Sequence, residues 1–259
     1  VGFDGGGHGL LLGGGSAGWL VAGLLAAEHG ELKITLIESS DVPTIGVGEG
    51  TWPSMRDTLR RIGLSESEFI RRCQVSFKQG SRFDGWARGG AGSDGDRYYH
   101  PFMLPVGYGD VDLVQPWLAT QAQRPFADVT SPSVQVCEAG RAPKQVQTPE
   151  FAAVANYAYH FDAGLFGQLL REHAIARLGV LHVVDHVDAV ISHENGDIAA
   201  LQTREHGELK ADLFIDCSGM ASRLIGQHFG VALKSERDVL FNDAALPVQV
   251  PYATPDAPL

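Results

Sequence analysis

The sequence has few cysteines, few basic residues and no long hydrophobic run. Its 259 residues include three cysteines, Cys73, Cys137 and Cys217, whose spacing matches no metal site. We interpret them as free thiols in a reducing compartment, which favours a cytoplasmic protein without a bound metal. No apolar stretch is long enough to span a bilayer. The first residues lack the basic region and the cleavage site of a secretory signal, so no signal peptide is predicted.

Positive charge is scarce. The chain has 20 Lys and Arg against 31 Asp and Glu, which gives a formal net charge of −11. Such a field repels polyphosphate backbones and anionic lipids, so neither a nucleic acid nor a membrane is an expected partner. An anionic cofactor would have to be held by local backbone dipoles instead.

The N-terminal part of the chain predicts a βαβ unit. Leu10–Leu12 and Leu32–Ile37 have the apolar character of buried parallel strands. Ser16–Glu28, between them, is predicted as a helix. Further helices are expected over Pro53–Ile62 and from Ser65 through Arg72, where the sequence Ser-Glu-Ser-Glu fits a capping box.

A glycine-rich string follows the first strand and opens the helix. The string GGGSAG has the G-x-G-x-x-G pattern, in which Gly13 permits a tight turn, Gly15 admits a pyrophosphate and Gly18 allows close packing of helix on strand. The N–H groups at the helix start bind phosphate oxygens. Glu38 lies twenty residues after Gly18, where a carboxylate accepts hydrogen bonds from a ribose. The spacing does not distinguish FAD from NAD. The cofactor-binding residues expected here are Gly13, Gly15, Ser16, Ala17, Gly18, Glu38 and Ser39.

The second half changes from helical to alternating periodicity. Asp162 is a good N-cap for a helix over Ala163–Leu178. After Asp216 and Gly219, another helix is expected over Ala221–Phe229. This ending resembles the distal FAD-binding motif of flavoproteins, in which the two residues approach the ribityl chain and the phosphates. An ordinary strand–turn–helix with a capping aspartate fits the same pattern. Four strands separated by turn residues predict a β-meander before it: Leu181–Val184, Val187–Ser192, Ile198–Thr203 and Leu209–Ile215.

Three segments between these halves carry candidate functional side chains. Ile45–Thr51 is a glycine-rich loop, Lys78 follows Val75 and Phe77 in an alternating strand, and Tyr98–Phe102 concentrates four rings in five residues. A loop over a cofactor, a lysine that faces a cavity and rings that stack on a flat arene would each be functional. A solvent loop, a solvated lysine and core packing are the structural alternatives. Composition alone does not separate the two sets.

Taken in order, these strings are similar to those of the tryptophan-type flavin-dependent halogenases. The matching strings are GGGSAGW (13–19), VGEGT (47–51), FKQGSRF (77–83), YYHPF (98–102), YHFDA (159–163) and DLFIDCSG (212–219). The resemblance implies an α/β fold, with a Rossmann-like FAD-binding domain over residues 1–259 that contains a parallel sheet and a β-meander. Residues 75–160 would be inserted to form the substrate site.

The resemblance also implies an activity, the halogenation with chloride or bromide of an electron-rich arene such as tryptophan or an indole. FAD would arrive as FADH2 from a separate flavin reductase and react with oxygen and a halide to give hypohalous acid. By position, Lys78 matches the catalytic lysine that presents the halogen, and His100 and Phe102 match the residues that sandwich the indole. Residues 43–51 match a strap between the flavin and substrate sites. The further cofactor-binding residues implied by the family, from the strap and from the adenine side, are Val47, Gly48, Glu49 and Val187.

The sequence departs from the family in length. Members are longer, and the Trp-x-Trp-x-Ile-Pro motif, the second catalytic carboxylate and the halide site of their C-terminal half have no counterpart here. Two other functions therefore stay open. One is an FAD-dependent aromatic monooxygenase, which has no need of Lys78, and the other is an inactive FAD-binding fragment. The arene, the halide, the ring position and a homodimeric state are not decided by the sequence.

Overall fold

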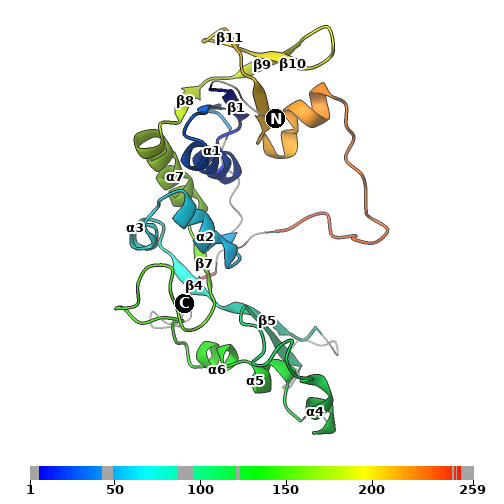
Figure 1. Ribbon diagram of the computed structural model, residues 1–259. Helices are drawn as coiled ribbons and strands as arrows, with labels where there is room; N and C mark the ends of the chain where they lie inside the picture. The colour runs from blue at the N-terminus through cyan, green and yellow to red at the C-terminus, as the bar shows by residue number, and fades with distance from the viewer. Residues whose placement is uncertain are drawn as a thin grey trace.

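The computed structural model describes residues 6–42, 49–86, 96–120, 123–246, 248 and 250–251. They form a mixed α/β fold with four sheets. A parallel sheet and a three-stranded antiparallel sheet lie at one end of the molecule, a hairpin with three short helices lies at the other, and a small sheet lies between them (Figure 1).

The parallel sheet confirms the predicted βαβ unit. Its strand order is β12-β1-β2-β8, and every neighbouring pair is parallel. Helix α1 connects β1 to β2, and helix α7 precedes β8. The bounds are β1 His8–Leu12, α1 Ser16–Glu28, β2 Lys33–Glu38, α7 Ala163–Leu178, β8 Leu181–Val184 and β12 Leu213–Asp216.

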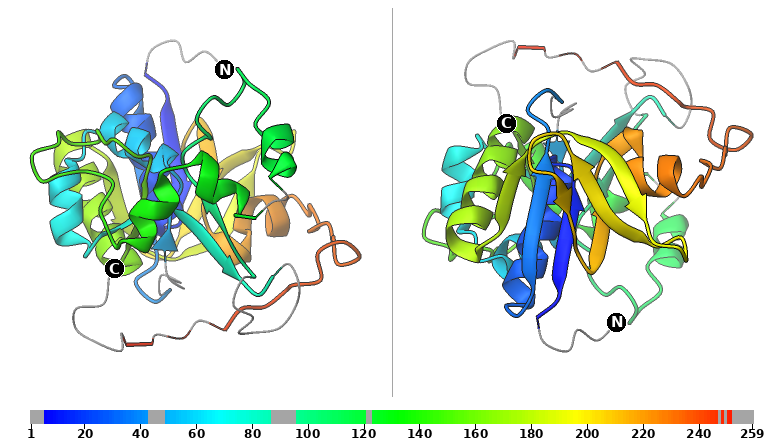
Figure 2. Two further views of the ribbon diagram at one scale, coloured as in Figure 1. Left: turned by 90° about the horizontal axis from the view of Figure 1, so that it is seen from below. Right: turned by 90° about the horizontal axis from the view of Figure 1, so that it is seen from above.

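Both faces of this sheet are buried, as the apolar runs predict. Leu11 of β1 packs in a core with α1 and α7, whereas its neighbours Leu10 and Leu12 pack in a second core on the opposite face. That second core includes Leu201 of the antiparallel sheet β11-β10-β9. Helices therefore cover one face of the parallel sheet and the antiparallel sheet covers the other (Figure 2). The strands of the antiparallel sheet are β9 Val187–Ser192, β10 Ile198–Thr203 and β11 Glu208–Leu209.

The predicted four-stranded meander is wrong, because its four segments belong to two different sheets. Its first strand, β8, joins the parallel sheet, because α7 returns the chain beside β2 as a crossover helix does. The expected strand Leu209–Ile215 is two strands in two different sheets, β11 and β12. The chain changes sheets at Asp212, whose backbone N–H donates to His8 O at 2.9 Å and whose carboxylate accepts from His8 N at 2.8 Å.

The helix expected over Ala221–Phe229 also differs. The chain forms a short 3₁₀ turn, Gly219–Ala221, and then a π-helical segment, Arg223–His228. The carboxylate of Asp216 accepts from the backbone N–H groups of Leu224 at 2.8 Å and Ile225 at 3.1 Å, as a capping residue does at the start of a helix. Within the segment, the N–H groups of Gln227 and Phe229 donate to the carbonyls of Ser222 and Leu224, five residues back, which is the π-helical pattern.

A small antiparallel sheet, β3-β7-β4, lies at the middle of the molecule (Figure 1). Side chains alternate between its two faces. Phe77 and Tyr159, directly paired across β4 and β7, belong to the helical core, while Lys78 and His160 follow them on the other face. The elements of this region are β3 Glu49–Gly50, α2 Ser54–Arg61, α3 Glu66–Arg72, β4 Ser76–Lys78 and β7 Ala158–Phe161.

The far end of the molecule consists of a hairpin and three short helices. Strands β5 and β6 pair with His100 opposite Ser81, and Gly80 lies so close to the β6 backbone that a Cβ there would be 2.6 Å from the His100 carbonyl. A larger residue at Gly80 would separate the strands. The bounds are β5 Gly80–Asp84, β6 Arg97–Pro101, α4 Val114–Ala119, α5 Phe126–Thr130 and α6 Ser133–Glu138.

The described residues from Val231 to Leu246 contain no helix or strand, and most of their apolar side chains are exposed. Within the described ranges, no helix combines the length and the apolar character needed to cross a membrane.

A buried ion pair ties the small sheet to α3. The Glu66 side chain is 2 % exposed and that of Lys144 is 8 % exposed, and their charged groups are 2.7 Å apart. The same carboxylate accepts from the hydroxyls of Tyr157 and Tyr159 and from the N–H of Phe151. Burial alone would raise the pKa of Glu66, but the hydrogen bonds from Lys144, Tyr157, Phe151 and Tyr159 outweigh burial and lower it.

Replacing Lys144 should leave the buried carboxylate of Glu66 without its positively charged partner. We expect Lys144→Met to lower the free energy of unfolding by about 3 kcal/mol. Arg60→Met, which breaks the exposed pair with Asp57 at 3.2 Å, should cost less than about 1 kcal/mol. Denaturant unfolding of both variants at pH 7 measures the difference.

The contribution of Glu66 to stability should depend on pH. Because the folded-state pKa of Glu66 is lowered, its contribution is present above the unfolded carboxyl pKa of about 4.3 and is lost as pH falls through the folded value. In Lys144→Met, burial should raise that pKa, so the variant should gain stability as Glu66 becomes protonated. The difference in the free energy of unfolding between the parent and Lys144→Met should thus become smaller in acid. A difference that stays constant with pH would show that Lys144 acts by packing alone.

Candidate functional site

The glycine string forms a tight turn between β1 and α1. Gly13 has φ of +118°, and a Cβ on it would be 2.2 Å from the carbonyl oxygen of Cys217. A Cβ on Gly18 would be 1.9 Å from the carbonyl oxygen of Gly13. Both positions therefore require glycine for the reasons that the sequence predicts, the turn and the close packing of helix on strand.

Gly15 differs from these two glycines because the space beside it is open. Among the described residues, no atom outside its chain neighbours lies within 4 Å of the position that its Cβ would take. Gly15 is also the N-cap of α1, and no side chain of the described ranges caps the first N–H groups of the helix there. Open space beside unpaired helical N–H groups, which belong to Ser16, Ala17 and Gly18, suits the pyrophosphate of a dinucleotide. The residues at this turn thus fit the pyrophosphate of a dinucleotide such as FAD.

Glu38 lies directly against the same turn. A Cβ on Gly14 would be 1.6 Å from Glu38 Oε2, so the carboxylate occupies the space that glycine leaves. Its other oxygen pairs with His182 Nε2 of β8 at 2.8 Å. The next residue, Ser39, forms hydrogen bonds with the His186 ring and accepts one from the backbone of Asp41. Two histidines that the sequence analysis did not single out therefore lie here, His182 on the Glu38 carboxylate and His186 on Ser39.

The distal motif lies on the other side of β1. Both oxygens of Asp216 accept hydrogen bonds from the chain itself, from Ser218 and from the π-helical segment, so this carboxylate shapes the loop in the way of a capping residue. Burial would raise the pKa of Asp216, yet these bonds lower it. Gly219 has φ of +63° and open space beside it. Val187 begins β9, and its carbonyl accepts from Arg223 at 2.7 Å.

Lys78 and three aromatic rings come together at the open face of the small sheet. The Lys78 Nζ atom is 5.6 Å from the ring centroid of Phe102 and 5.6 Å from that of Trp52. The Trp52 ring is 5.4 Å from Phe102 and 6.3 Å from His100. The lysine that the sequence places on an alternating strand therefore faces rings rather than bulk solvent alone. Phe102 is held by a bond from its N–H to Gln79 O.

Sequence reasoning missed two members of this cluster, Trp52 and His160. A Cβ on Gly50 would be 3.1 Å from the His160 ring and 3.2 Å from Lys78 Nζ, so these two groups flank the same space. Burial and the positive charge of Lys78 lower the pKa of His160, and a bond to the Glu49 backbone offsets part of that shift. His160 is thus uncharged at neutral pH. The pairing of β7 with β3 and β4 brings it there, and no local string reveals that pairing.

The strap is described only at its C-terminal end. Val47 and Gly48 lie outside the described residues. Glu49 follows them in β3, where it pairs with Phe161. The chain segment that starts at Glu38, against the glycine turn, therefore ends beside Lys78 and His160. This one segment connects the two predicted sites.

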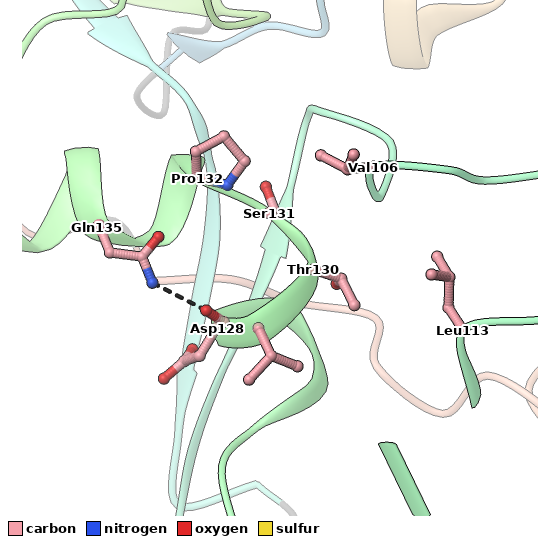
Figure 3. A pocket seen from close by; sticks show the side chains of 8 residues that line it. Val106, Leu113, Asp128, Thr130, Ser131, Pro132 and Gln135 are labelled. Carbon is pink, nitrogen blue, oxygen red and sulfur yellow. Dashed lines mark hydrogen bonds between the residues drawn. The ribbon is translucent and has the colours of Figure 1, made fainter. Parts of the chain in front are cut away.

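A cavity of about 320 Å³ lies elsewhere, between the α5–α6 region and the preceding loop (Figure 3). Two of the residues that line it are joined by a hydrogen bond from Gln135 Nε2 to Asp128 O at 2.9 Å. None of the predicted site residues lines it. Its lining includes Val106, Leu113, Asp128, Ser131, Pro132 and Gln135. In the described part of the chain, no group of three His, Cys, Asp or Glu side chains is placed to hold a metal ion.

Comparison with known proteins agrees with this arrangement. The family model described as tryptophan halogenase matches residues 10–259. The chain is 35% identical over 257 residues to tryptophan 7-halogenase RebH of Lentzea aerocolonigenes, covering 94% of this chain and 48% of that protein. It is 34% identical to tryptophan 6-halogenase SttH of Streptomyces toxytricini, covering 93% of this chain and 49% of that protein. The chain thus spans about half the length of the curated relatives it matches.

A solved structure is similar over the same extent. The crystal structure of a tryptophan halogenase from Shewanella frigidimarina superimposes with a TM-score of 0.91 at 48% sequence identity. It covers 96% of this chain, which corresponds to 49% of that structure. The match at this identity supports the fold and the relationship together.

The open space at Gly15 makes a clean test of cofactor binding. Gly15→Val should leave the apo chain folded, because a Cβ there meets no atom of the described residues, but the side chain should occupy the place of the pyrophosphate and abolish FAD binding. Gly30→Val, also into open space but outside the turn, should bind FAD as the parent does. FAD titration followed by flavin fluorescence, with thermal unfolding of each variant, measures both effects. Equal FAD affinity in Gly15→Val and the parent would refute the assignment.

Proposed function

Because this chain belongs to the tryptophan halogenase family, we propose that it forms the FAD-binding and lysine-bearing part of a flavin-dependent halogenase. Its substrate would be an electron-rich arene such as tryptophan or another indole. The observation that carries the proposal is the position of Lys78, whose amine lies 5.6 Å from the ring centroids of both Phe102 and Trp52. A nucleophilic amine beside aromatic rings suits the transfer of an electrophile to a flat, electron-rich ring.

The cofactor is proposed to be held at the glycine turn. Gly15 would admit the pyrophosphate to the start of α1, beside the turn and the close packing that Gly13 and Gly18 permit, and Glu38 would accept from the ribose through its carboxylate. The bound group, reduced by a separate flavin reductase, would supply hypohalous acid from oxygen and chloride or bromide. Contacts from Ser39, the strap, Val187 and Gly219 are part of the same proposal. Backbone dipoles support it, because they attract an anion despite the net charge of −11.

Residues 75–160 are proposed to build the substrate site. They contribute Lys78, the His100 and Phe102 rings and the strand that carries His160. A neutral Lys78 amine can bond to the halogen, and an ammonium can donate a hydrogen bond to hypohalous acid. His160, uncharged at neutral pH, adds no second positive charge beside it. The rings would hold the arene flat next to the lysine.

Substrate recognition can be tested apart from turnover. Phe102→Ala should remove about 1 kcal/mol of stacking and burial, which is a loss of indole affinity of about fivefold, while FAD affinity stays unchanged. Phe83→Ala, at the other end of the same hairpin where the ring stacks on Tyr98, should leave indole affinity unchanged. Titration calorimetry with indole decides. Identical indole affinity in Phe102→Ala and the parent would return this ring to a packing role.

Lys78 gives the test of the reaction itself. In the complete protein, Lys78→Ala should abolish halogenation of added indole and leave oxygen consumption by reduced FAD near the parental rate, since that step needs no lysine. Lys78→Arg should fail too, because a guanidinium stays protonated and does not bond to halogen as an amine does. Lys210→Ala, at an exposed lysine, should behave like the parent. Mass spectrometry of products with bromide and an oxygen electrode provide the two measurements.

The same experiment separates the competing activities. A hydroxylated product from the parent would identify an aromatic monooxygenase, and the absence of any product would identify an inactive FAD-binding module. Normal bromination by Lys78→Ala would contradict the role proposed for the lysine.

A further inference from the structure

Trp52 is an indole already placed beside the lysine. Its ring lies as close to Lys78 Nζ as the Phe102 ring does, with both centroids at 5.6 Å. It is 58% exposed, so more than half of its surface is accessible to a reagent. The protein therefore carries, at its proposed reaction centre, a side chain of the same chemical class as the proposed substrate.

Hydrogen bonds hold the backbone that carries this ring. Thr51 N donates to Tyr159 O at 2.9 Å, and Thr51 Oγ1 accepts from Tyr159 N at 3.1 Å. On the other side, Met55 N donates to Trp52 O at 3.0 Å at the entry to α2. The backbone of Trp52 is thus held between a strand pairing and a helix start, which keeps the indole beside Lys78 and Phe102.

We propose that Trp52 is itself a halogenation site, modified through Lys78 when no substrate lies between the lysine and the ring. The inference rests on the proposed function for the source of hypohalous acid in turnover. Self-halogenation would compete with the substrate reaction and would change the ring that borders the arene site.

The step balances with the reagents already named. The neutral Lys78 amine attacks the halogen of hypohalous acid, an N–X bond forms and water leaves. The electron-rich indole of Trp52 then attacks that halogen, so the N–X bond breaks and a C–X bond forms. The proton displaced from the ring carbon returns to the Lys78 nitrogen. The indole is oxidised by two electrons, the halogen is reduced from +1 to −1, and the amine is regenerated.

The other tryptophans provide internal comparisons. Trp19 is buried, with 1% of its surface exposed, and the Trp117 indole N–H donates to Arg124 O at 2.8 Å. Trp86 is the sharpest control, because it is 73% exposed and no lysine lies over its ring among the described residues. Reaction governed by exposure alone would modify Trp86 ahead of Trp52. Transfer through Lys78 reverses that order.

The test uses dilute hypobromite added directly to the folded chain, so that it needs no flavin reaction. Trypsin then releases Trp52 in the peptide of residues 34–56 and Trp86 in the peptide of residues 83–88, each with one tryptophan and no tyrosine. The mass shift and the isotope doublet of bromine in each peptide measure the two yields in one sample. In the parent we expect more bromine on Trp52 than on Trp86.

The variants show whether the lysine is the cause. Lys78→Met keeps the length of the side chain and removes the amine, and it should lower the ratio of Trp52 to Trp86 bromination about tenfold or more, because an oriented transfer becomes a bimolecular one. Lys210→Met should leave the ratio unchanged. Faster bromination of Trp86 in the parent, or an unchanged ratio in Lys78→Met, would overturn the inference.

A second arm separates this inference from the proposed function. The protein is incubated with reduced FAD, oxygen and bromide, without an arene, and the same peptides are measured. Lysine-dependent labelling of Trp52 by hypobromite together with none in this arm would refute the halogenase activity and leave the transfer from Lys78 to Trp52 intact. Labelling of Trp52 in both arms supports both.

Discussion

The buried carboxylate of Glu66 is the interaction on which the proposed reaction centre depends. It accepts from Lys144, from the Phe151 backbone and from the hydroxyls of Tyr157 and Tyr159. These donors come from the segment that leads into β7 and from β7 itself, whereas Glu66 begins α3. The carboxylate therefore fixes β7 against the helical core. Because β7 is the central strand of the small sheet, it places both neighbouring strands.

The small sheet connects this buried network to the proposed reaction centre. One face packs Phe77 and Tyr159 into the core, and the opposite face presents Lys78 and His160. The hydrogen bonds to Glu66 on the core side of the small sheet thus determine where Lys78 and His160 lie on its opposite face. Four hydrogen bonds to one carboxylate offset its desolvation, which is why the network can be buried at all.

The two proposed sites use different physical means. At the glycine turn, an anion would be held by backbone N–H groups in space that only glycines leave open, so a negatively charged protein can still bind a negatively charged cofactor. At the small sheet, side chains contribute a cation and aromatic rings. The segment from Glu38 to Trp52 joins the two. Trp52 adds a further consequence, since the proposed reaction centre would bring an electrophile next to one of the protein's own indole rings.

Local sequence decided much of this molecule. The string GGGSAG between an apolar strand and an apolar helix was sufficient to predict the βαβ unit, and Asp162 and Ser65 begin their helices as capping residues should. These features depend on neighbours within a few residues. Lys78 and Phe102 were also identified as candidates from their strings, although a lysine on a strand has two faces and the sequence left both open.

Only the tertiary structure decided which strands share a sheet and which side chains meet. The run Leu209–Ile215 is divided because Leu209 pairs antiparallel with Leu201 and Leu213 pairs parallel with Gly9, a choice set by residues two hundred positions away. The same holds for His182 beside Glu38 and for Trp52 and His160 beside Lys78. Each of these contacts follows from strand register, and register is a long-range property because it depends on which apolar faces are buried together.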